Sequence, residues 1–488
     1  MSAQMMTNPC NPGGGGVDAS PLAGPRGEVR AAGAGPLRIA VVGTGVSGLG
    51  AAWLLDLQHD VTVYEQDGRL GGHVNTVSVA DSAGELGVDT GFIVFNERNY
   101  PHLAALFRHL GVATRATDMS FAATIDQGRV EYAGDNLNAL FGQRRNLVNW
   151  RHWRMVAQIL RFNRHARRVL DDPLLEDQSL GEFLAEGGYS AELRDRYLMP
   201  MGAAIWSCPV EEMQSFPASA FLRFFDNHGL LTLKDRPQWR TVIGGSREYV
   251  RKLIDSLRGV VRTDCAVTGV RRDRDGVTVH DSRGGACRYD HVVIATHADQ
   301  ALRLLDPPGF WEQTVLGAFR YQRNRAVLHT DPSLMPRNPR VWSSWNYIGE
   351  PGTGNAGNSV SVTYWMNRLQ RLPGRTPYLV TLNPSREPRP DRVIAEFEYE
   401  HPVFDQAAGR AQRLLERVQG PDRTWFCGAY FGYGFHEDGL RSGIEVARRF
   451  GIDPPWETTQ HPGQQPLRNR VDLGRPAATD AVAASVRG

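Results

Sequence analysis

A glycine motif directly after a short apolar run constrains the fold of this 488-residue chain more than any other feature. Residues 37–42 (Leu-Arg-Ile-Ala-Val-Val) have the composition of a buried parallel strand, and residues 46–57 have that of a helix. The glycines Gly43, Gly45 and Gly48 follow the strand with the spacing G-x-G-x-x-G. A second apolar run at 60–65 has the pattern of another strand, so we predict that the folded part begins with a β-α-β unit.

Each glycine of this motif has its own physical role in binding a dinucleotide. The first permits a tight turn, the second lets the backbone approach a pyrophosphate, and the third lets the helix pack closely on the strand. Val46 and Ser47 begin the helix, where unpaired N–H groups and the positive end of the helix dipole attract phosphate. We therefore predict a Rossmann-like α/β domain with its phosphate site at residues 43–48.

Glu65 indicates which dinucleotide fits. It ends the second strand, about 20 residues after the glycine motif, where a carboxylate accepts hydrogen bonds from ribose hydroxyls. The same carboxylate would repel a 2′-phosphate. The pattern therefore favours FAD or NAD over NADP.

A resemblance separates FAD from NAD. Arg69-Leu70-Gly71-Gly72-His73 follows Glu65 closely, and here the chain resembles the flavin amine oxidase and phytoene desaturase superfamily, whose first motif ends in such a Gly-Gly turn. The resemblance continues in Asp89-Thr90-Gly91-Phe92, in Gly244-Gly245-Ser246, and in the closing pattern of residues 426–429 and 438–443. It implies FAD as the cofactor, held in a Rossmann-like (glutathione-reductase-type) domain with an interleaved α+β substrate domain.

The resemblance also implies which residues contact FAD. Val267 would meet the adenine through its backbone, and the last helix would point its N-terminus at the flavin, where its dipole stabilises negative charge on the reduced ring. Family members usually carry an acidic residue after the glycine of the last strand; this chain has Ala429, so Tyr430 or Glu437 would have to supply that contact. The implied cofactor contacts are Gly43, Gly45, Val46, Ser47, Gly48, Glu65, Gln66, Arg69, Gly71, Gly72, His73, Thr90, Gly91, Val267, Thr296, Gly428, Gly439 and Leu440.

More closely, residues 38–451 resemble a bacterial family of NAD/FAD-binding proteins similar to the N-terminal region of plant cyclopropane fatty acid synthases. This implies an FAD-dependent oxidoreductase that oxidises or desaturates a lipid or fatty-acyl substrate by hydride transfer to flavin N5. Two alternatives stay open. One is an amine oxidase, in which aromatic side chains among residues 430–435 would frame the amine. The other is a flavin-binding accessory protein for a lipid methyltransferase partner.

His436 and Glu437 are the candidate catalytic residues. They precede the turn that faces the flavin, so they are the best candidates for an acid/base pair near the ring. A structural role, in which they cap the helix together with Asp438, is an equal alternative. No cluster of His, Cys and carboxylate residues has the spacing of metal ligands, so we predict no metal.

The pattern of elements predicts two interleaved domains between two tails. The FAD-binding domain is expected at 37–95, 235–300 and 405–452, and the substrate-binding domain at 96–234 and 301–404. Within the latter, residues 100–198 have mostly helical periodicity, and strand-like runs between 326 and 404 predict an antiparallel sheet. Residues 1–36, rich in Gly, Ala and Pro, are expected to be a disordered tail, and residues 453–488 a loosely ordered one.

Composition limits the partners. The formal net charge is +2, which gives no long-range attraction to nucleic acid, so a small-molecule or lipid substrate is expected instead. The five cysteines are scattered and form no C-x-x-C pair, which favours a reducing cytoplasm over a disulfide framework. No apolar run reaches roughly 18 residues, so no membrane span is expected, while peripheral contact of an apolar patch with a membrane stays open.

Overall fold

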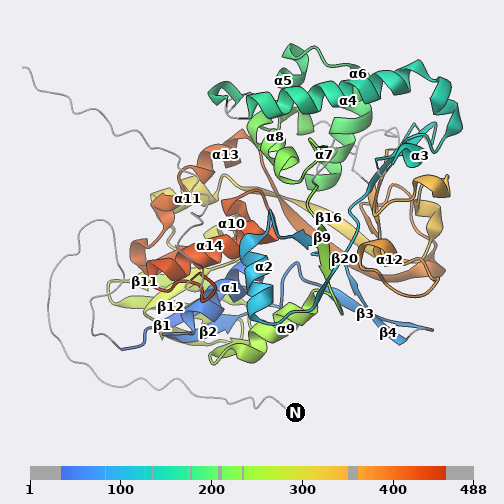
Figure 1. Ribbon diagram of the computed structural model, residues 1–488. Coiled ribbons are helices and arrows are strands. Elements are labelled where there is room, and N and C mark those ends of the chain that lie inside the picture. Colours follow the sequence, from blue (N-terminus) through green and yellow to red (C-terminus); the bar gives the residue numbers. More distant parts are fainter. Residues whose placement is uncertain are drawn as a thin grey trace, which may run out of the picture.

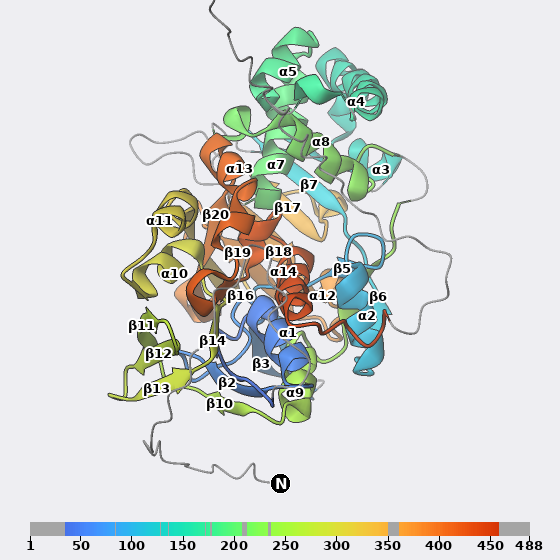
Figure 2. The ribbon, with the colours of Figure 1, turned by 90° about the vertical axis from the view of Figure 1, so that its left-hand side faces the viewer.

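The computed structural model describes residues 35–457, except 83, 127, 135, 171, 176–177, 207–211, 233–235 and 350–360. The predicted tails 1–36 and 453–488 lie outside the described residues, apart from 35–36 and 453–457. Figures 1 and 2 both place a helical region, with α4 (Trp150–Val169) and α5 (Leu180–Glu186), at one end of the molecule. The strands β1 (Arg38–Val42) and β2 (Asp60–Tyr64) lie at the other end.

The strands β1 and β2 belong to a five-stranded parallel sheet, and the predicted β-α-β unit is confirmed. Its helix is α1 (Val46–Leu55). Val41 pairs with Val63 of β2 on one side and with Val293 on the other. The strand order is β10 (Val260–Arg262), β2, β1, β14 (His291–Ile294) and β21 (Thr424–Phe426).

The two faces of this sheet are both buried, which explains its near-continuous apolar strands. Ile39 and Val41 point to one face and Ala40 and Val42 to the other, because side chains alternate along a strand. The first face is covered by α1, α2 (Pro101–His109), α9 (Arg247–Ser256) and α14 (His436–Arg449). The second is covered by β11 (Val267–Asp273), β12 (Gly276–Asp281), β13 (Ala286–Tyr289), α10 (Ala298–Leu304), α11 (Phe310–Leu316) and α13 (Gln406–Gln412).

A second sheet of seven strands corrects the prediction of a purely antiparallel sheet. Its order is β20 (Val393–Val403), β16 (Arg320–His329), β19 (Leu379–Leu382), β18 (Ser361–Trp365), β17 (Trp345–Ile348), β7 (Phe121–Ile125) and β8 (Val130–Ala133). It is mixed, because β17 pairs with β7 in parallel. The prediction missed β7 and β8, whose side chains are mostly buried and therefore lack a polar alternation.

The predicted strand at 341–347 is also wrong in its first half. Pro339–Val341 forms a 3-10 turn, which the Asn338 side chain caps by accepting the N–H of Arg340. Ser343 N donates to the side chain of Asn346, and this closes a second turn before the strand begins at Trp345. Local side-chain bonds of this kind compete with strand pairing.

The helical region follows the predicted periodicity and has recognisable caps. The Asn149 side chain accepts from Arg151 N at the start of α4, and Ser179 and Glu182 form a capping box at the start of α5. The other helices are α3 (Leu137–Leu140), α6 (Ala191–Leu193), α7 (Met199–Trp206) and α8 (Ala218–Asn227). Their apolar faces share one core with the second sheet, which joins the helical region to it.

Short elements complete the described chain. The strands β3 (Thr76–Asp81) and β4 (Gly84–Asp89) form a hairpin, and β5 (Phe95–Asn96), β9 (Trp239–Val242) and β6 (Thr114–Ala116) form a small sheet. Apart from short 3-10 and π turns, the remaining described elements are β15 (Leu305–Asp306) and α12 (Met366–Leu369). Among the described residues, no helix combines the length and the apolar character that crossing a bilayer requires. The predicted α/β class with a Rossmann-like sheet is confirmed.

Candidate functional site

The predicted cofactor residues gather at one edge of the parallel sheet. The glycine motif follows β1, Glu65 follows β2, Thr296 follows β14 and Gly428 follows β21. Since all five strands run parallel, their carboxyl ends meet at this edge. In open α/β sheets this edge, where the strand order reverses, is where ligands bind.

The surroundings of the three motif glycines differ. Gly43 has a φ of +101°, and a Cβ there would lie 2.9 Å from the carbonyl oxygen of Ala295. A Cβ on Gly48 would collide with the carbonyl oxygen of Gly43. A Cβ on Gly45, the N-cap of α1, would meet nothing within 4 Å, so open space adjoins the helix N-terminus.

Glu65 is tied to the glycine loop through Thr44, which the sequence analysis did not single out. The Glu65 carboxylate is buried and accepts hydrogen bonds from Thr44 N at 3.1 Å and from the Thr44 hydroxyl. The same hydroxyl oxygen accepts the N–H of Gly71 at 3.1 Å. Thr44 therefore holds both the Glu65 carboxylate and the Gly-Gly turn against the glycine loop.

The Gly-Gly turn packs onto this loop. A Cβ on Gly72, whose φ is +58°, would lie 3.1 Å from Gly45 Cα. The Arg69 guanidinium donates to the carbonyl oxygens of Val74 at 2.6 Å and Gly72 at 2.9 Å, which holds the turn closed. Of the implied contacts, Gln66 next to Glu65 is exposed, whereas Gly91 lies so close to the carbonyl of His73 that a Cβ would collide with it.

His73 is enclosed by other rings and leaves one nitrogen without a partner. Its ring centroid lies 5.3 Å from that of Tyr399 and 5.4 Å from that of His401. Burial lowers the pKa of His73 well below its usual value, so the imidazole is neutral. Its Nε2 is buried and has no hydrogen-bond partner among the described residues. The Thr90 hydroxyl, 2.7 Å from the Tyr399 hydroxyl, fixes the other side of this enclosure.

Asp89 of the D-x-G segment connects three parts of the chain. Its carboxylate accepts hydrogen bonds from the Thr76 hydroxyl at 2.6 Å, from Ser246 N at 2.9 Å and from Gln370 Nε2 at 2.8 Å. Burial raises the pKa of Asp89 to about 6. The sequence analysis did not find Gln370, because it lies far along the chain and has no motif of its own.

The last helix crosses the first one at glycine contacts. A Cβ on Gly439 would lie 2.9 Å from both Ser47 Oγ and Val46 Cγ1, and a Cβ on Gly443 would lie 3.1 Å from Ala51 N. The hydroxyl of Ser442 links the end of β21 to α14: it accepts Gly428 N at 2.9 Å and donates to Gly439 O at 2.7 Å. Leu440 is buried. The N-terminal ends of α1 and α14 therefore converge, and Figures 1 and 2 show the two helices side by side.

His436 and Glu437 lie in the first turn of α14, and their side chains have separate partners. His436 stacks on Phe92, with ring centroids 3.8 Å apart, and its Nε2 lies 3.1 Å from the Tyr249 hydroxyl. Burial lowers the pKa of His436 to about 3. The Glu437 carboxylate accepts the N–H groups of His102 at 2.9 Å and Leu103 at 3.0 Å, so it caps α2. Burial raises the pKa of Glu437 to about 7.

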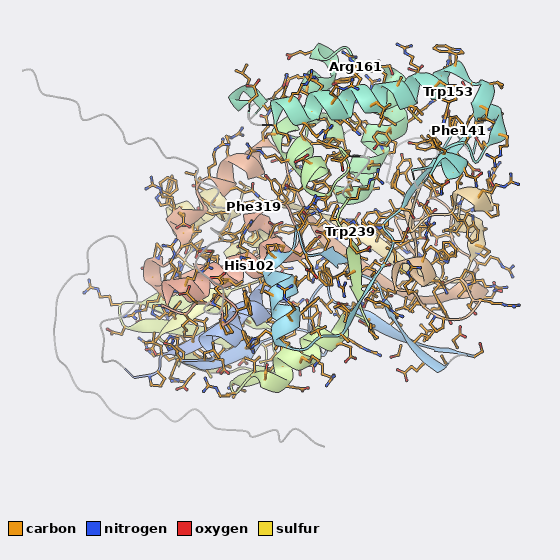
Figure 3. All side chains as sticks on the ribbon, in the orientation of Figure 1. His102, Phe141, Trp153, Arg161, Trp239 and Phe319 are labelled. Atoms are coloured by element: carbon orange, nitrogen blue, oxygen red, sulfur yellow. The ribbon has the colours of Figure 1, made fainter. Side chains whose placement is uncertain are left out.

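Figure 3 shows His102 on α2 at its approach to α14. Asp438, in the first turn of α14, accepts with its carboxylate the N–H of Tyr433 at 2.9 Å and that of Phe435, the N-cap residue, at 3.1 Å. The carboxylates at the start of α14 are thus bonded to backbone N–H groups.

The remaining implied contacts border the same edge. Thr296 and Val267 are half-buried, and Thr296 follows β14 directly after Ala295, which touches Gly43. Tyr430, which could replace the acidic residue missing at Ala429, is buried, and its hydroxyl has no hydrogen-bond partner among the described residues. No group of three or more His, Cys, Asp or Glu side chains in the described part of the chain could hold a metal ion.

The residues at this edge fit an extended dinucleotide. Two helix N-termini supply N–H groups and positive dipoles, one suited to a pyrophosphate and the other to an electron-rich ring. The glycines leave room for close approach of a ligand to the backbone. The unpartnered His73 Nε2 and Tyr430 hydroxyl are polar atoms that a bound ligand would satisfy.

Comparison with known proteins agrees with this geometry. Residues 46–450 match the family model of flavin-containing amine oxidoreductases. The chain is 27% identical over 279 residues to AofH, a protein of Mycobacterium tuberculosis named for flavin-containing monoamine oxidase activity. That match covers 55% of this chain and 59% of the relative, less than two thirds of its length.

Solved structures share the fold at low identity. They include a CLA-producing fatty acid isomerase from P. acnes (15% identity, TM-score 0.61, 85% of this chain and 99% of that one). A putrescine oxidase bound to putrescine is similar too, with 17% identity and a TM-score of 0.60. So is cyclohexylamine oxidase from Brevibacterium oxydans, with 16% identity and a TM-score of 0.59. Each of these two matches covers 85% of this chain and 98% of the other chain. Because the family model spans most of the chain, the chain belongs to the flavin-containing amine oxidoreductase family, and its cofactor is FAD.

Proposed function

We propose that this chain is an FAD-dependent oxidoreductase that oxidises or desaturates a lipid or fatty-acyl substrate. The observation that carries this proposal is the aromatic contact between the start of α14 and the helical region. FAD, when bound, supplies a hydride acceptor at N5. The protein has to place the reacting carbon there and keep water away.

The aromatic contact begins at Phe435, the N-cap of α14. Its ring stacks on Phe224 of α8 at 5.0 Å, and Phe224 stacks on His228 at 3.6 Å. Burial lowers the pKa of His228 to about 4, so this imidazole is neutral near pH 7. The Glu437 and Asp438 carboxylates both bond to backbone N–H groups, and Asp438 is also paired with Arg441 at 2.9 Å, so neither is an unpaired anion that would bind a cationic amine. That favours an acyl chain over a charged amine.

We propose FAD contacts from the residues implied by the sequence, with Gly43, Gly45 and Gly48 at the pyrophosphate and Glu65 at the adenosine ribose. His73 would donate or accept a hydrogen bond through its unpartnered Nε2. The start of α14, with Gly439 and Leu440, would lie against the flavin.

We propose separate roles for His436 and Glu437. His436 stays neutral and positions the Tyr249 hydroxyl through its Nε2. Glu437, with a pKa of about 7, changes its protonation near neutral pH, which suits a general acid or base. Its loss of charge would also weaken its hold on the N-terminus of α2.

An amine oxidase is the second candidate, favoured by the name of the mycobacterial relative and by the putrescine and cyclohexylamine oxidases among the similar structures. Purified holoenzyme should be mixed without oxygen with oleate or with benzylamine, while the visible absorbance of the flavin is followed. The lipid-type activity predicts bleaching by oleate alone. Bleaching by benzylamine alone would show an amine oxidase instead.

A variant pair sharpens this test. Phe224→Ser should slow bleaching by oleate, because it removes a buried ring that contacts Phe435, whereas Phe310→Ser changes a ring that is 73% exposed on α11. Equal flavin content in both variants shows that they fold. A flavin that neither donor reduces, together with a co-purifying methyltransferase, would point to the accessory role.

We also propose the domain division and the location. Residues 37–95, 235–300 and 405–452 would form the FAD-binding domain, and 96–234 and 301–404 the substrate-binding domain. In support, every strand of the parallel sheet comes from the first set and every strand of the seven-stranded sheet from the second. A cytoplasmic location suits the buried free thiols of Cys265, Cys287 and Cys427. Kinship with the cyclopropane-synthase-like bacterial family completes the proposal.

A further inference from the structure

Six exposed apolar side chains lie on α3, on the turn that follows it and on α4 as far as Leu160. In Figure 1 these elements lie at one corner of the helical region, far from the parallel sheet. Val148 is 89% exposed, Leu137 75% and Trp150 63%. The six members are Leu137, Leu147, Val148, Trp150, Trp153 and Leu160, and together with the arginines described next we call them the 137–168 surface.

The same segment is strongly basic. From residue 136 to residue 170 the sequence holds no Asp or Glu, whereas the whole chain is almost neutral at +2. Its arginines are all exposed: Arg144, Arg145, Arg151, Arg154, Arg161, Arg164, Arg167 and Arg168. Arg154 has a carboxylate nearby, that of Glu192 at 3.8 Å, while Arg161 donates to the carbonyl oxygen of Gly188 at 3.2 Å. The surface therefore keeps a large excess of positive charge.

The side of α4 that faces the core has its own apolar residues, so the exposed apolar residues are not needed to fill the core. His152, Met155, Phe162 and Ala166 lie on that side at helical spacing and pack inward. Trp153 is held on the outer side, because its Nε1 donates to Leu147 O at 2.9 Å and its ring lies 4.9 Å from that of Phe141. Figure 3 shows Trp153 and Phe141 at this corner, with Arg161 farther along α4. The indole is thus fixed in an exposed position beside the arginines.

We propose that the 137–168 surface docks the protein on a membrane that contains anionic lipid. An interfacial helix presents arginines to lipid phosphates while Trp, Leu and Val enter the boundary between headgroups and acyl chains. Trp is suited to this depth because its ring is apolar and its N–H is polar. This docking is independent of the proposed activity, because it uses none of the cofactor residues.

The composition favours a membrane over the two other classes of partner. Protein–protein interfaces are enriched in aromatic residues and Arg, but their core is depleted in charged residues overall, and here eight exposed arginines accompany six apolar side chains. A nucleic acid would use the arginines and tryptophans but would gain nothing from Leu137, Leu147, Val148 and Leu160. An anionic bilayer uses both kinds of side chain at once.

The experiment is co-sedimentation of the full-length holoprotein with vesicles. The protein should sediment with vesicles of phosphatidylcholine that contain about a third phosphatidylglycerol, and it should stay in the supernatant with vesicles of pure phosphatidylcholine. Arg151→Gln with Arg164→Gln should weaken binding about fivefold per arginine. Val148→Ser with Trp150→Ser should weaken it about tenfold or more.

Phe310→Ser with Trp311→Ser is the matched control, because it removes an exposed aromatic pair on α11, away from this corner (Figure 1). It should leave binding unchanged. Unaltered flavin content in all variants shows intact folding, and the two independent pairs guard against a fold defect in one of them. No binding to phosphatidylglycerol vesicles, equal loss in the control, or retention on poly-uridine RNA in place of vesicles would overturn the proposal.

Discussion

Replacing Gly43 by alanine tests the geometry of the glycine loop with a control that shares its backbone conformation. Gly43 has a φ of +101° and Gly84, at the turn between β3 and β4, a φ of +108°. An L-residue at either position costs about 1–3 kcal/mol of free energy of unfolding. Around Gly84 a Cβ meets nothing within 4 Å, whereas at Gly43 it would lie 2.9 Å from Ala295 O. Contacts of carbon with carbonyl oxygen lie at about 3.3 Å or more.

The clash requires β1 and β14 to separate by a few tenths of an ångström at the edge where we propose that the cofactor binds. Overpacking of this kind costs about 1–3 kcal/mol in addition to the shared backbone strain. In urea, the free energy of unfolding of Gly43→Ala should therefore be lower than that of Gly84→Ala by that amount. Titration of the apoproteins with FAD should show weaker binding, by about tenfold or more, in Gly43→Ala alone. Equal stability and equal FAD affinity in the two variants would refute the proposed role of this loop.

Three other perturbations probe the rest of the site. Gly443→Ala should lower the free energy of unfolding by about 1–3 kcal/mol in urea because it forces α1 and α14 apart, whereas Gly409→Ala on α13, where a Cβ meets open space, should raise it by up to about 1 kcal/mol. Glu65→Gln should weaken FAD binding about tenfold in a fluorescence titration, because it removes the carboxylate that accepts from Thr44 and that we propose accepts from the ribose, and unchanged affinity would contradict that assignment. The pKa of His436 is about 3 in the folded protein, so the folded state binds fewer protons than the unfolded one below pH 6.5, and stability falls as the pH drops. Between pH 6.5 and pH 5 the free energy of unfolding of the wild type should fall by about 2 kcal/mol more than that of His436→Gln, measured by urea unfolding at each pH. Equal decreases in the two proteins would show that His436 is not buried as described.

The sequence was most informative where local patterns and burial agree. The strand, glycine turn and helix of residues 38–55 follow directly from the motif, because Gly43 and Gly48 each have a steric reason. The convergence of α14 on α1 could be anticipated from the second glycine cluster, Gly439 and Gly443. The strands β7 and β8 could not, because buried strands without polar alternation give no period to detect.

Several site residues have partners that sequence position cannot reveal. Glu437 is seven residues after Tyr430 in sequence, but its carboxylate bonds to the backbone of α2, more than 300 residues away along the chain. Gln370 reaches Asp89 in the same way. Thr44 lies inside the motif, yet the motif assigns no role to its variable positions. Such contacts depend on tertiary packing, which propensity and spacing do not encode.

The visible absorption spectrum of the purified protein tests the central claim most directly. If the N-termini of α1 and α14 converge on one FAD molecule, the protein should be yellow, or become so with added FAD, and heat should release the dinucleotide in a ratio of one per chain. A protein that stays colourless after incubation with excess FAD, while remaining folded by circular dichroism, would contradict the account.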